Sequence, residues 1–208
     1  MSEITFYTNP QSRGQIVHWL LEELDVAYDT QWVEYGEQMK SPDYLAVNPM
    51  GKVPAISHRG AVVTEVAAIC LYLAAVYPEQ GLIPKPGSAE LASYYRWMLF
   101  AAGPLEMATT VKSIGWESTP EQSRMLGFGS YSDTLAALEL ALREGPHICG
   151  EQFTAVDVYL GAALNWGIQF GTIEKRPVFD EYATRLQRRP AAQRAVQINE
   201  ERMHRDGV

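Results

Sequence analysis

Three polar segments of the sequence carry residue types that can bind or activate a ligand. The first, Tyr7–Gly14 (YTNPQSRG), joins the end of a predicted strand to the start of a predicted helix. Loops at that place are where α/β sheets bind ligands. Ser12 either caps the helix that follows, by accepting from an unpaired N–H group, or supplies a catalytic hydroxyl. The two roles are compatible, so both stay open at this point.

The second segment, Asn48–Ile56 (NPMGKVPAI), has a proline at the entry to another predicted strand. About 5–6% of X–Pro bonds in folded proteins are cis. A cis Val53–Pro54 bond would turn the Val53 backbone outward as a free donor and acceptor pair. Such a pair can dock a peptide-like ligand as an additional strand.

The third segment, Thr64–Leu73 (TEVAAICLYL), begins an apolar helix with an acidic residue, Glu65. A helix N-terminus offers unpaired N–H groups and the positive end of the helix dipole, which suit a carboxylate. Glu65 either complements that dipole or holds a ligand ammonium group while the helix start holds the adjacent carboxylate. In the second case the segment would recognise the α-amino acid end of a ligand.

The elements that must position these segments alternate in the first part of the chain. Strands are predicted over Ile4–Thr8, Ala27–Val33, Ala55–His58 and Ala61–Thr64, the last two as a hairpin around Arg59–Gly60. Helices are predicted from Ser12 to Leu24, over Pro42–Ala46 as a short turn, and over Glu65–Tyr77. The order β-α-β-α-β-β-α predicts one small mixed sheet of four strands, with a parallel pair and an antiparallel edge.

The second part of the chain is predicted to be entirely helical. Pro78–Ser88 contains three prolines and two glycines and indicates a linker. Helices are predicted beyond it over Ala89–Val111, Pro120–Arg143, Ala155–Phe170, Val178–Arg188 and Ala191–Arg205. Thr154 and Asp157 are spaced as in a capping box. We therefore expect an α/β domain over residues 1–78 and an all-α domain over residues 88–208.

Composition excludes several classes of partner. The 208 residues carry 17 lysines and arginines against 25 aspartates and glutamates, a net charge of −8. A chain this acidic is a poor match for nucleic acid or an anionic membrane surface, so we expect neither as a partner. Its two cysteines, Cys70 and Cys149, form no disulfide framework and fit a reducing compartment. The first residues have no basic and apolar leader, so we expect no signal peptide. The four histidines lack metal-ligand spacing, and no metal is expected.

Taken together, three pieces of this sequence resemble the glutathione S-transferase superfamily, in particular its bacterial-type cytosolic members. These pieces are Gly51–Ala55 (GKVPA), the acidic Thr64–Glu65 before Ala68–Leu73, and Phe153–Gly161 (FTAVDVYLG). The resemblance covers nearly the whole chain. It implies a thioredoxin-like first domain that binds glutathione as co-substrate and a helical second domain that contributes the pocket for an electrophile. It also implies a cytoplasmic homodimer that works in detoxification, in which the loop Val47–Met50 and the long helix from Ala89 contact the partner chain.

The resemblance assigns roles to individual residues. The residue that stabilises the glutathione thiolate corresponds best to Ser12, with Asn9 and Tyr7 as rivals. The glutathione-binding residues implied are Gln11, Lys52, Val53, Pro54, Glu65 and Val66. The resemblance, together with the need to expose the Val53 backbone to a peptide ligand, predicts that the Val53–Pro54 bond is cis. The family usually has serine or threonine where this chain has Val66, so a hydroxyl for the γ-glutamyl carboxylate is missing. Trp166 and Phe170, one helical turn apart, are candidates for the electrophile pocket or for the core.

These roles predict a transferase that adds the glutathione thiolate to a small apolar electrophile. Two other functions remain open on the same scaffold. Asn9 and Gln11 beside Ser12 are also compatible with a glutathione-dependent disulfide reductase or peroxidase. Val66 favours a non-catalytic binding protein, because it removes one expected contact to glutathione.

Overall fold

The computed structural model describes residues 2–207, which divide into two compact units. Unit 1 contains the chain up to Gln80 together with the segment from Arg189 onward, and unit 2 is Gly81–Arg188. Unit 1 holds the only sheet found among the described residues. Each unit is described below by itself.

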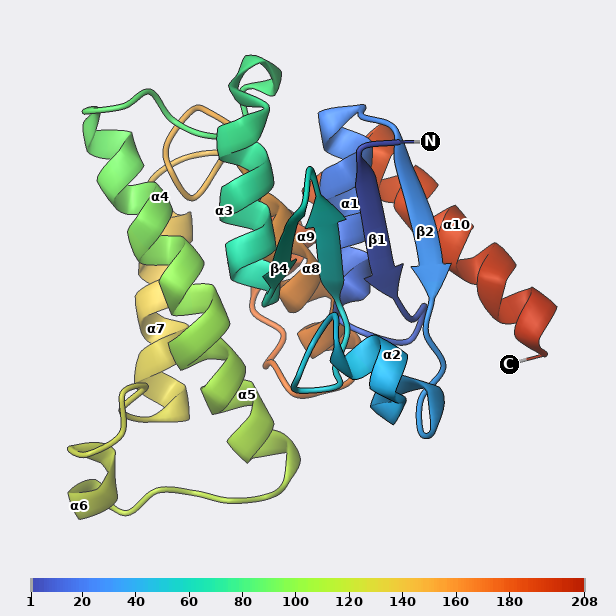
Figure 1. Cartoon of the computed structure of the whole chain (residues 1–208). Coiled ribbons are helices and arrows are strands. Elements are labelled where there is room, and N and C mark those ends of the chain that lie inside the picture. Colours follow the sequence, from blue (N-terminus) through green and yellow to red (C-terminus); the bar gives the residue numbers. More distant parts are fainter. Residues whose placement is uncertain (1, 208) are drawn as a thin grey trace. The chain divides into compact units, whose positions relative to one another are not determined.

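The sheet of unit 1 has the predicted four strands in the order β2-β1-β3-β4 (Figure 1). Their bounds are Ile4–Thr8 for β1, Tyr28–Trp32 for β2, Ala55–His58 for β3 and Ala61–Thr64 for β4. β1 and β2 are parallel, while β3 is antiparallel to both β1 and β4. The predicted mixed sheet, with its parallel pair and its hairpin, is therefore confirmed.

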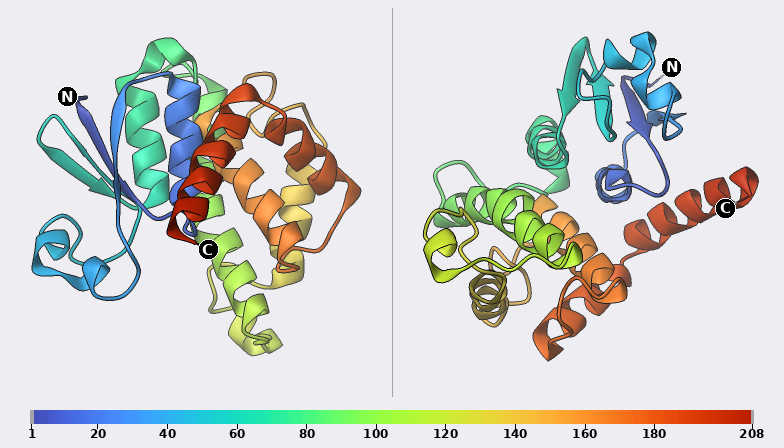
Figure 2. Two further views of the ribbon diagram at one scale, coloured as in Figure 1. Left: turned by 90° about the vertical axis from the view of Figure 1, so that its right-hand side faces the viewer. Right: turned by 90° about the horizontal axis from the view of Figure 1, so that it is seen from below.

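Helices cover both faces of this sheet (Figures 1 and 2). α1 (Gly14–Leu24) and α3 (Val66–Val76) lie on one face, and α2 (Pro42–Leu45), which follows a 3₁₀ turn at Gln38–Lys40, lies on the other. Successive side chains of a strand point to opposite faces. Phe6 accordingly packs against His18 of α1, with ring centroids 5.0 Å apart, whereas Tyr7 faces Tyr44 of α2.

The last helix, α10 (Pro190–Asp206), packs against α1 and belongs to unit 1. Two ion pairs join the helices, Arg189 to Glu23 with an N–O distance of 2.6 Å and Arg194 to Glu22 at 2.8 Å. We expected this helix within the segment 88–208, which the sequence assigned to the second domain. In the structure, α10 belongs to the same compact unit as the sheet. The domain boundaries at residues 78 and 88 remain a prediction.

Unit 2 is built from helices, as predicted, but two of them differ from expectation. Their bounds are α4 Ala89–Phe100, α5 Glu106–Ser113, α6 Pro120–Ser123, α7 Tyr131–Leu142, α8 Ala155–Gln169 and α9 Pro177–Gln187. The single helix expected over Pro120–Arg143 is wrong. A break with Gly129 at φ 65° separates α6 from α7, and Ser130 caps α7. The helix expected over Ala89–Val111 contains a π-helical segment, Ala101–Leu105, with Pro104 inside it.

The predicted capping box at the start of α8 is present. The Thr154 N–H donates to Asp157 Oδ2 over 2.8 Å, and Tyr182 of α9 donates its hydroxyl to Asp157 Oδ1 over 2.6 Å. The Ile148 N–H donates to the same oxygen over 3.0 Å. Burial, followed by the Asp157 charge, raises the pKa of Tyr182, which keeps this donor protonated. Asp157 therefore fixes three segments of unit 2.

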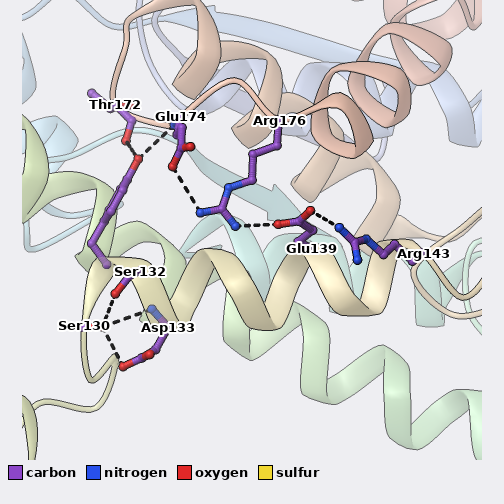
Figure 3. Close-up of polar contacts among 9 residues, drawn as sticks. Ser130, Ser132, Asp133, Glu139, Arg143, Thr172, Glu174 and Arg176 are labelled. Atoms are coloured by element: carbon purple, nitrogen blue, oxygen red, sulfur yellow. Dashed lines mark hydrogen bonds and ion pairs between the residues drawn. The ribbon is translucent and has the colours of Figure 1, made fainter.

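A second polar network ties α7 to the segment before α9 (Figure 3). Arg176 donates to Glu139 over 2.7 Å and to Glu174 over 3.2 Å. The Tyr131 hydroxyl donates to the Thr172 carbonyl and accepts from the Glu174 N–H. None of the predicted site residues takes part, which indicates that this network supports the fold of unit 2.

None of the helices in residues 2–207 combines the length and the apolar composition that a membrane crossing requires.

Candidate functional site

The strand register brings the three polar segments to one edge of the sheet in unit 1. Tyr7 near the end of β1 pairs with Ala55 at the start of β3, and Ala55 pairs with Thr64 at the end of β4. The loop after β1, the segment before β3 and the start of α3 after β4 consequently meet at the same edge. This is the edge at which α/β sheets hold ligands.

The loop after β1 is organised by Asn9, whose side chain is 5% exposed. Its Nδ2 donates to the Val33 carbonyl over 3.0 Å, and its Oδ1 accepts from the Gln11 N–H over 3.0 Å. The Asn9 carbonyl accepts from both the N–H and the hydroxyl of Ser12, at 3.2 and 2.7 Å. Gln11 itself is exposed, and its carbonyl accepts from the Tyr35 hydroxyl.

Ser12 lies two residues before the start of α1 and is 7% exposed. Its Oγ donates to the Asn9 carbonyl and accepts from the Gly14 N–H over 3.0 Å. The helix begins at Gly14 with Arg13 in the cap position, two residues later than predicted. The Ser12 oxygen nevertheless satisfies one of the helix's first N–H groups, so the capping role expected from the sequence is partly realised.

Gly14 allows the loop to approach the strand end closely. A Cβ at this position would lie 1.9 Å from Thr8 Oγ1 and 2.9 Å from Ser12 Oγ. Both distances are too short for non-bonded atoms, so a side chain here would displace Thr8 or Ser12. The small residue is what lets Ser12 lie against the end of β1.

Tyr7 packs on the opposite face of the sheet from α1. Its ring is half-buried against the cluster of Val33, Met39 and Tyr44, and the Tyr7 and Tyr44 ring centroids are 6.0 Å apart. The side chain is thus part of a small apolar cluster, as well as a candidate donor to the thiolate.

The segment before β3 is held by side chains that the sequence analysis did not single out. Lys40 Nζ donates to the carbonyls of Met50 and Gly51 at 2.9 and 3.0 Å. The Tyr44 hydroxyl and Asn48 Nδ2 both donate to the Lys52 carbonyl over 2.7 Å. Burial, and then the nearby Tyr7, raise the pKa of Tyr44 to about 12, so this donor is protonated at neutral pH.

Val53 follows these fixed carbonyls and lies outside the strand ladder, which begins at Ala55. Within residues 2–207, no hydrogen bond joins the N–H or the C=O of Val53 to another part of the chain. The Val53–Pro54 peptide bond is cis, and this prediction is confirmed. The Lys52 side chain is exposed and Pro54 is buried.

Glu65 stands immediately before α3 with an exposed side chain and a φ of 67°. Positive φ is uncommon for residues other than glycine, and such residues cluster at functional sites. The Glu65 side chain makes no capping hydrogen bond to the helix. Val66, the first residue of α3, is buried and has no hydroxyl at this helix start.

Trp166 and Phe170 belong to unit 2 and are not among the residues gathered at the sheet edge. Trp166 is half-buried in α8, and Phe170, which directly follows that helix, is 72% exposed. Their role in an electrophile pocket stays a prediction.

Among the described residues, no group of three or more histidine, cysteine, aspartate or glutamate side chains is arranged to hold a metal ion.

Comparisons with known proteins agree on one family. Residues 12–76 match the family model described as "Glutathione S-transferase, N-terminal domain". A glutathione S-transferase of Escherichia coli O157:H7 is 30% identical over 156 residues, which are 74% of this chain and 77% of that protein.

Solved structures give the same result over almost the whole chain. A glutathione transferase from Methylococcus capsulatus str. Bath is 30% identical with a TM-score of 0.78, covering 95% of this chain and 98% of that one. A sphingomonad glutathione S-transferase solved in complex with glutathione is 27% identical with a TM-score of 0.77, covering 94% and 98%.

Proposed function

The chain belongs to the glutathione S-transferase superfamily, and we propose that it binds glutathione at the sheet edge of unit 1 and conjugates the glutathione thiolate to a small apolar electrophile. The observation that carries this proposal is the strand register. It aligns the loop with Ser12, the Val53 backbone and the start of α3 along one edge.

Each part of glutathione has a chemically matched partner at this edge. The free N–H and C=O of Val53, next to Pro54, pair with the cysteinyl backbone as an added strand would. Glu65 binds the γ-glutamyl ammonium group, while the Val66 N–H and the positive end of α3 bind the adjacent carboxylate. Lys52, exposed beside Val53, reaches the glycyl carboxylate, and Gln11 adds a polar contact from the loop.

Ser12 is the residue we assign to the thiolate, with Asn9 and Tyr7 as the alternatives. A hydroxyl that donates to sulfur favours the charged form, and so does the positive end of α1. In the reaction the thiol proton leaves to solvent. The sulfur electron pair forms a bond to the electrophilic carbon, and the leaving group departs with the electron pair of the broken bond.

A second candidate, a non-catalytic binding protein, is favoured by two features of the same site. The Ser12 hydroxyl already donates to the Asn9 carbonyl, so it must turn to reach a sulfur atom. Val66 lacks the hydroxyl that would bind a carboxylate. A disulfide reductase or peroxidase that uses glutathione stays a further alternative.

Two measurements on the purified chain separate these functions. We expect retention on a glutathione-affinity column and turnover of chlorodinitrobenzene. If the column retains the protein but the protein turns over neither this electrophile nor disulfide or peroxide substrates, the result would support the binding protein. Turnover of disulfides or peroxides alone would support the reductase, and absence of both retention and turnover would contradict glutathione as the ligand.

The proposal includes a cytoplasmic homodimer that acts in detoxification. Large exposed apolar side chains on the surfaces expected to meet a partner support the dimer: Met50 at 63% exposure and Leu99 of α4 at 63%. The free thiols of Cys70 and Cys149, both buried, are compatible with the reducing cytoplasm.

A further inference from the structure

We propose that Asn9 is a positioning residue that holds Ser12 in place, and that Asn9 does not itself contact the glutathione sulfur. This inference rests on the proposed function, because it concerns how the same site presents its hydroxyl. It separates two residues that the sequence left as rivals for one role.

The first support is where the Asn9 amide points. Its nitrogen donates to the carbonyl of Val33, which directly follows β2, and its oxygen accepts from the N–H of Gln11 in the loop. The two ends of the amide therefore bind backbone groups of two separate segments. The Val33 N–H donates in turn to the Thr8 carbonyl over 2.8 Å, so Val33 is hydrogen-bonded both to Thr8 and to the Asn9 side chain.

The second support is how Ser12 depends on Asn9. The Asn9 carbonyl accepts from the Ser12 N–H and from the Ser12 hydroxyl, at 3.2 and 2.7 Å. The hydroxyl has a single proton, so its bond to the Asn9 carbonyl is released when Ser12 donates to sulfur, and the bond from the Ser12 N–H then keeps Ser12 beside Asn9. Because the Asn9 side chain is only 5% exposed, its amide is packed into the loop, as a positioning group would be.

The two roles predict different behaviour in a double-mutant cycle. A group that donates to the sulfur acts whether or not Ser12 is present. A group that only positions Ser12 loses its effect once the Ser12 hydroxyl is gone, because interacting residues are not additive. The readout is the thiol pKa of bound glutathione, which a merely structural role elsewhere in the protein would not change.

The experiment uses the full chain as wild type, Asn9→Ala, Ser12→Ala and the double variant. Glutathione binding is measured by calorimetry, and the thiol is titrated by the ultraviolet absorbance of the thiolate. We expect Asn9→Ala and Ser12→Ala each to raise the pKa of the bound thiol by about one unit. We expect the pKa of the bound thiol in the double variant to be no higher than in Ser12→Ala alone.

Two controls separate positioning from a general loss of structure. Asn199 in α10 is also buried, at 1% exposure, and its amide donates to the Ala195 carbonyl. Asn199→Ala should leave the thiol pKa at the wild-type value. Asn9→Ser is the conservative variant. Serine can still accept from a nearby N–H in a turn, so the thiol pKa in this variant should lie between those of wild type and Asn9→Ala. It also serves as the test variant if Asn9→Ala does not fold.

Additive shifts in the double variant would overturn the inference, because they would show that Asn9 acts on the sulfur independently of Ser12. An unchanged thiol pKa in both Asn9 variants would overturn it as well. If wild-type protein binds no glutathione, the proposed function fails together with the inference. If the pKa shifts are additive while wild-type protein binds glutathione normally, the positioning role of Asn9 is overturned and the proposed function stands.

Discussion

At the scale of single residues, Ser12 has two tasks that one oxygen atom performs. It satisfies the Gly14 N–H at the start of α1, and in the proposed reaction it donates to the glutathione thiolate. The two tasks have different consequences when the hydroxyl is removed. Loss of the first reduces stability, and loss of the second raises the pKa of the bound thiol.

We therefore expect Ser12→Ala to lower kcat more than it weakens glutathione binding, and to reduce the free energy of unfolding by about 1 kcal/mol. The pH–rate profile should move to higher pH. Activity is compared well below the melting transition, so that the stability change does not contribute. An unmoved profile in Ser12→Ala, together with a shifted one in Tyr7→Phe, would transfer the role to Tyr7.

Val66 offers the opposite experiment, a gain of one contact. Valine and threonine have nearly the same shape, so Val66→Thr adds a hydroxyl at the start of α3 with little disturbance. A hydrogen bond to a charged group contributes about 1.5–3 kcal/mol, so glutathione affinity should rise roughly 10- to 100-fold. The thiol pKa should stay unchanged, because the hydroxyl meets the carboxylate and not the sulfur.

Calorimetric titration of glutathione measures this difference, with Val66→Ile as the control that adds volume without a donor. Equal affinities for Val66→Thr and wild type would mean that no carboxylate lies at this helix start.

At the scale of elements, the packing of α10 on α1 encloses a histidine. His18 of α1 is fully buried, and its Nδ1 lies 3.3 Å from Asn199 Oδ1 of α10. Its ring is surrounded by Phe6, Tyr28 and Trp32. Burial lowers the pKa of His18 to about 4, and the Asn199 contact and the Glu22 charge oppose this shift only in part.

The sign of the resulting pH dependence follows from proton binding. Unfolded His18 takes up a proton near pH 6.5, while the folded protein keeps it neutral down to about pH 4. Its contribution to the free energy of unfolding is therefore fully present above pH 6.5 and falls as pH decreases toward 4, by about 3 kcal/mol. Chemical denaturation across this range should show a shallower slope for His18→Phe than for wild type.

The exposed His204 of α10 supplies the matched control, since His204→Gln should keep the wild-type slope. Identical curves for wild type and His18→Phe would contradict a neutral buried His18.

Elements with a strong local pattern were the ones that the sequence predicted well. β1, β3 and β4 have the predicted bounds, because alternating apolar residues, prolines and the Arg59–Gly60 turn mark them locally. The break before α7 was not predicted, although Gly127, Gly129 and the capping Ser130 are typical of a loop that precedes a helix. The packing of α10 on α1 was not predictable either, because it depends on contacts between residues far apart in the sequence, such as the ion pair of Arg194 with Glu22.

The candidate site likewise contains residues that the sequence marks and residues that it does not. Residue type and position singled out Ser12, Val53 and Glu65 as candidates, and the strand register brings their segments to one edge of the sheet. Lys40, Tyr44 and Asn48 were missed, because they bind backbone carbonyls, and a carbonyl acceptor has no signature in the sequence. The positive φ of Glu65 was missed as well, because no sequence signal around a glutamate indicates the positive-φ backbone conformation that favours glycine.

At the scale of the whole molecule, we expect two copies of the chain to associate. Light scattering at micromolar concentration should give the mass of two chains. Leu99→Arg should shift the protein toward one chain, because it places a charge on the α4 surface expected at the interface. Leu140 of α7 is equally exposed, at 64%, and Leu140→Arg is the control that should leave the mass unchanged. A single-chain mass for wild type would contradict the dimer.

A crystal structure of the protein with glutathione would show whether the ligand binds along the sheet edge of unit 1. We predict that the cysteinyl backbone pairs with the N–H and C=O of Val53. The γ-glutamyl ammonium group should lie at Glu65, and the sulfur at the start of α1 beside Ser12. Glutathione bound elsewhere on the chain, or no glutathione at saturating concentration, would contradict a glutathione site at this edge.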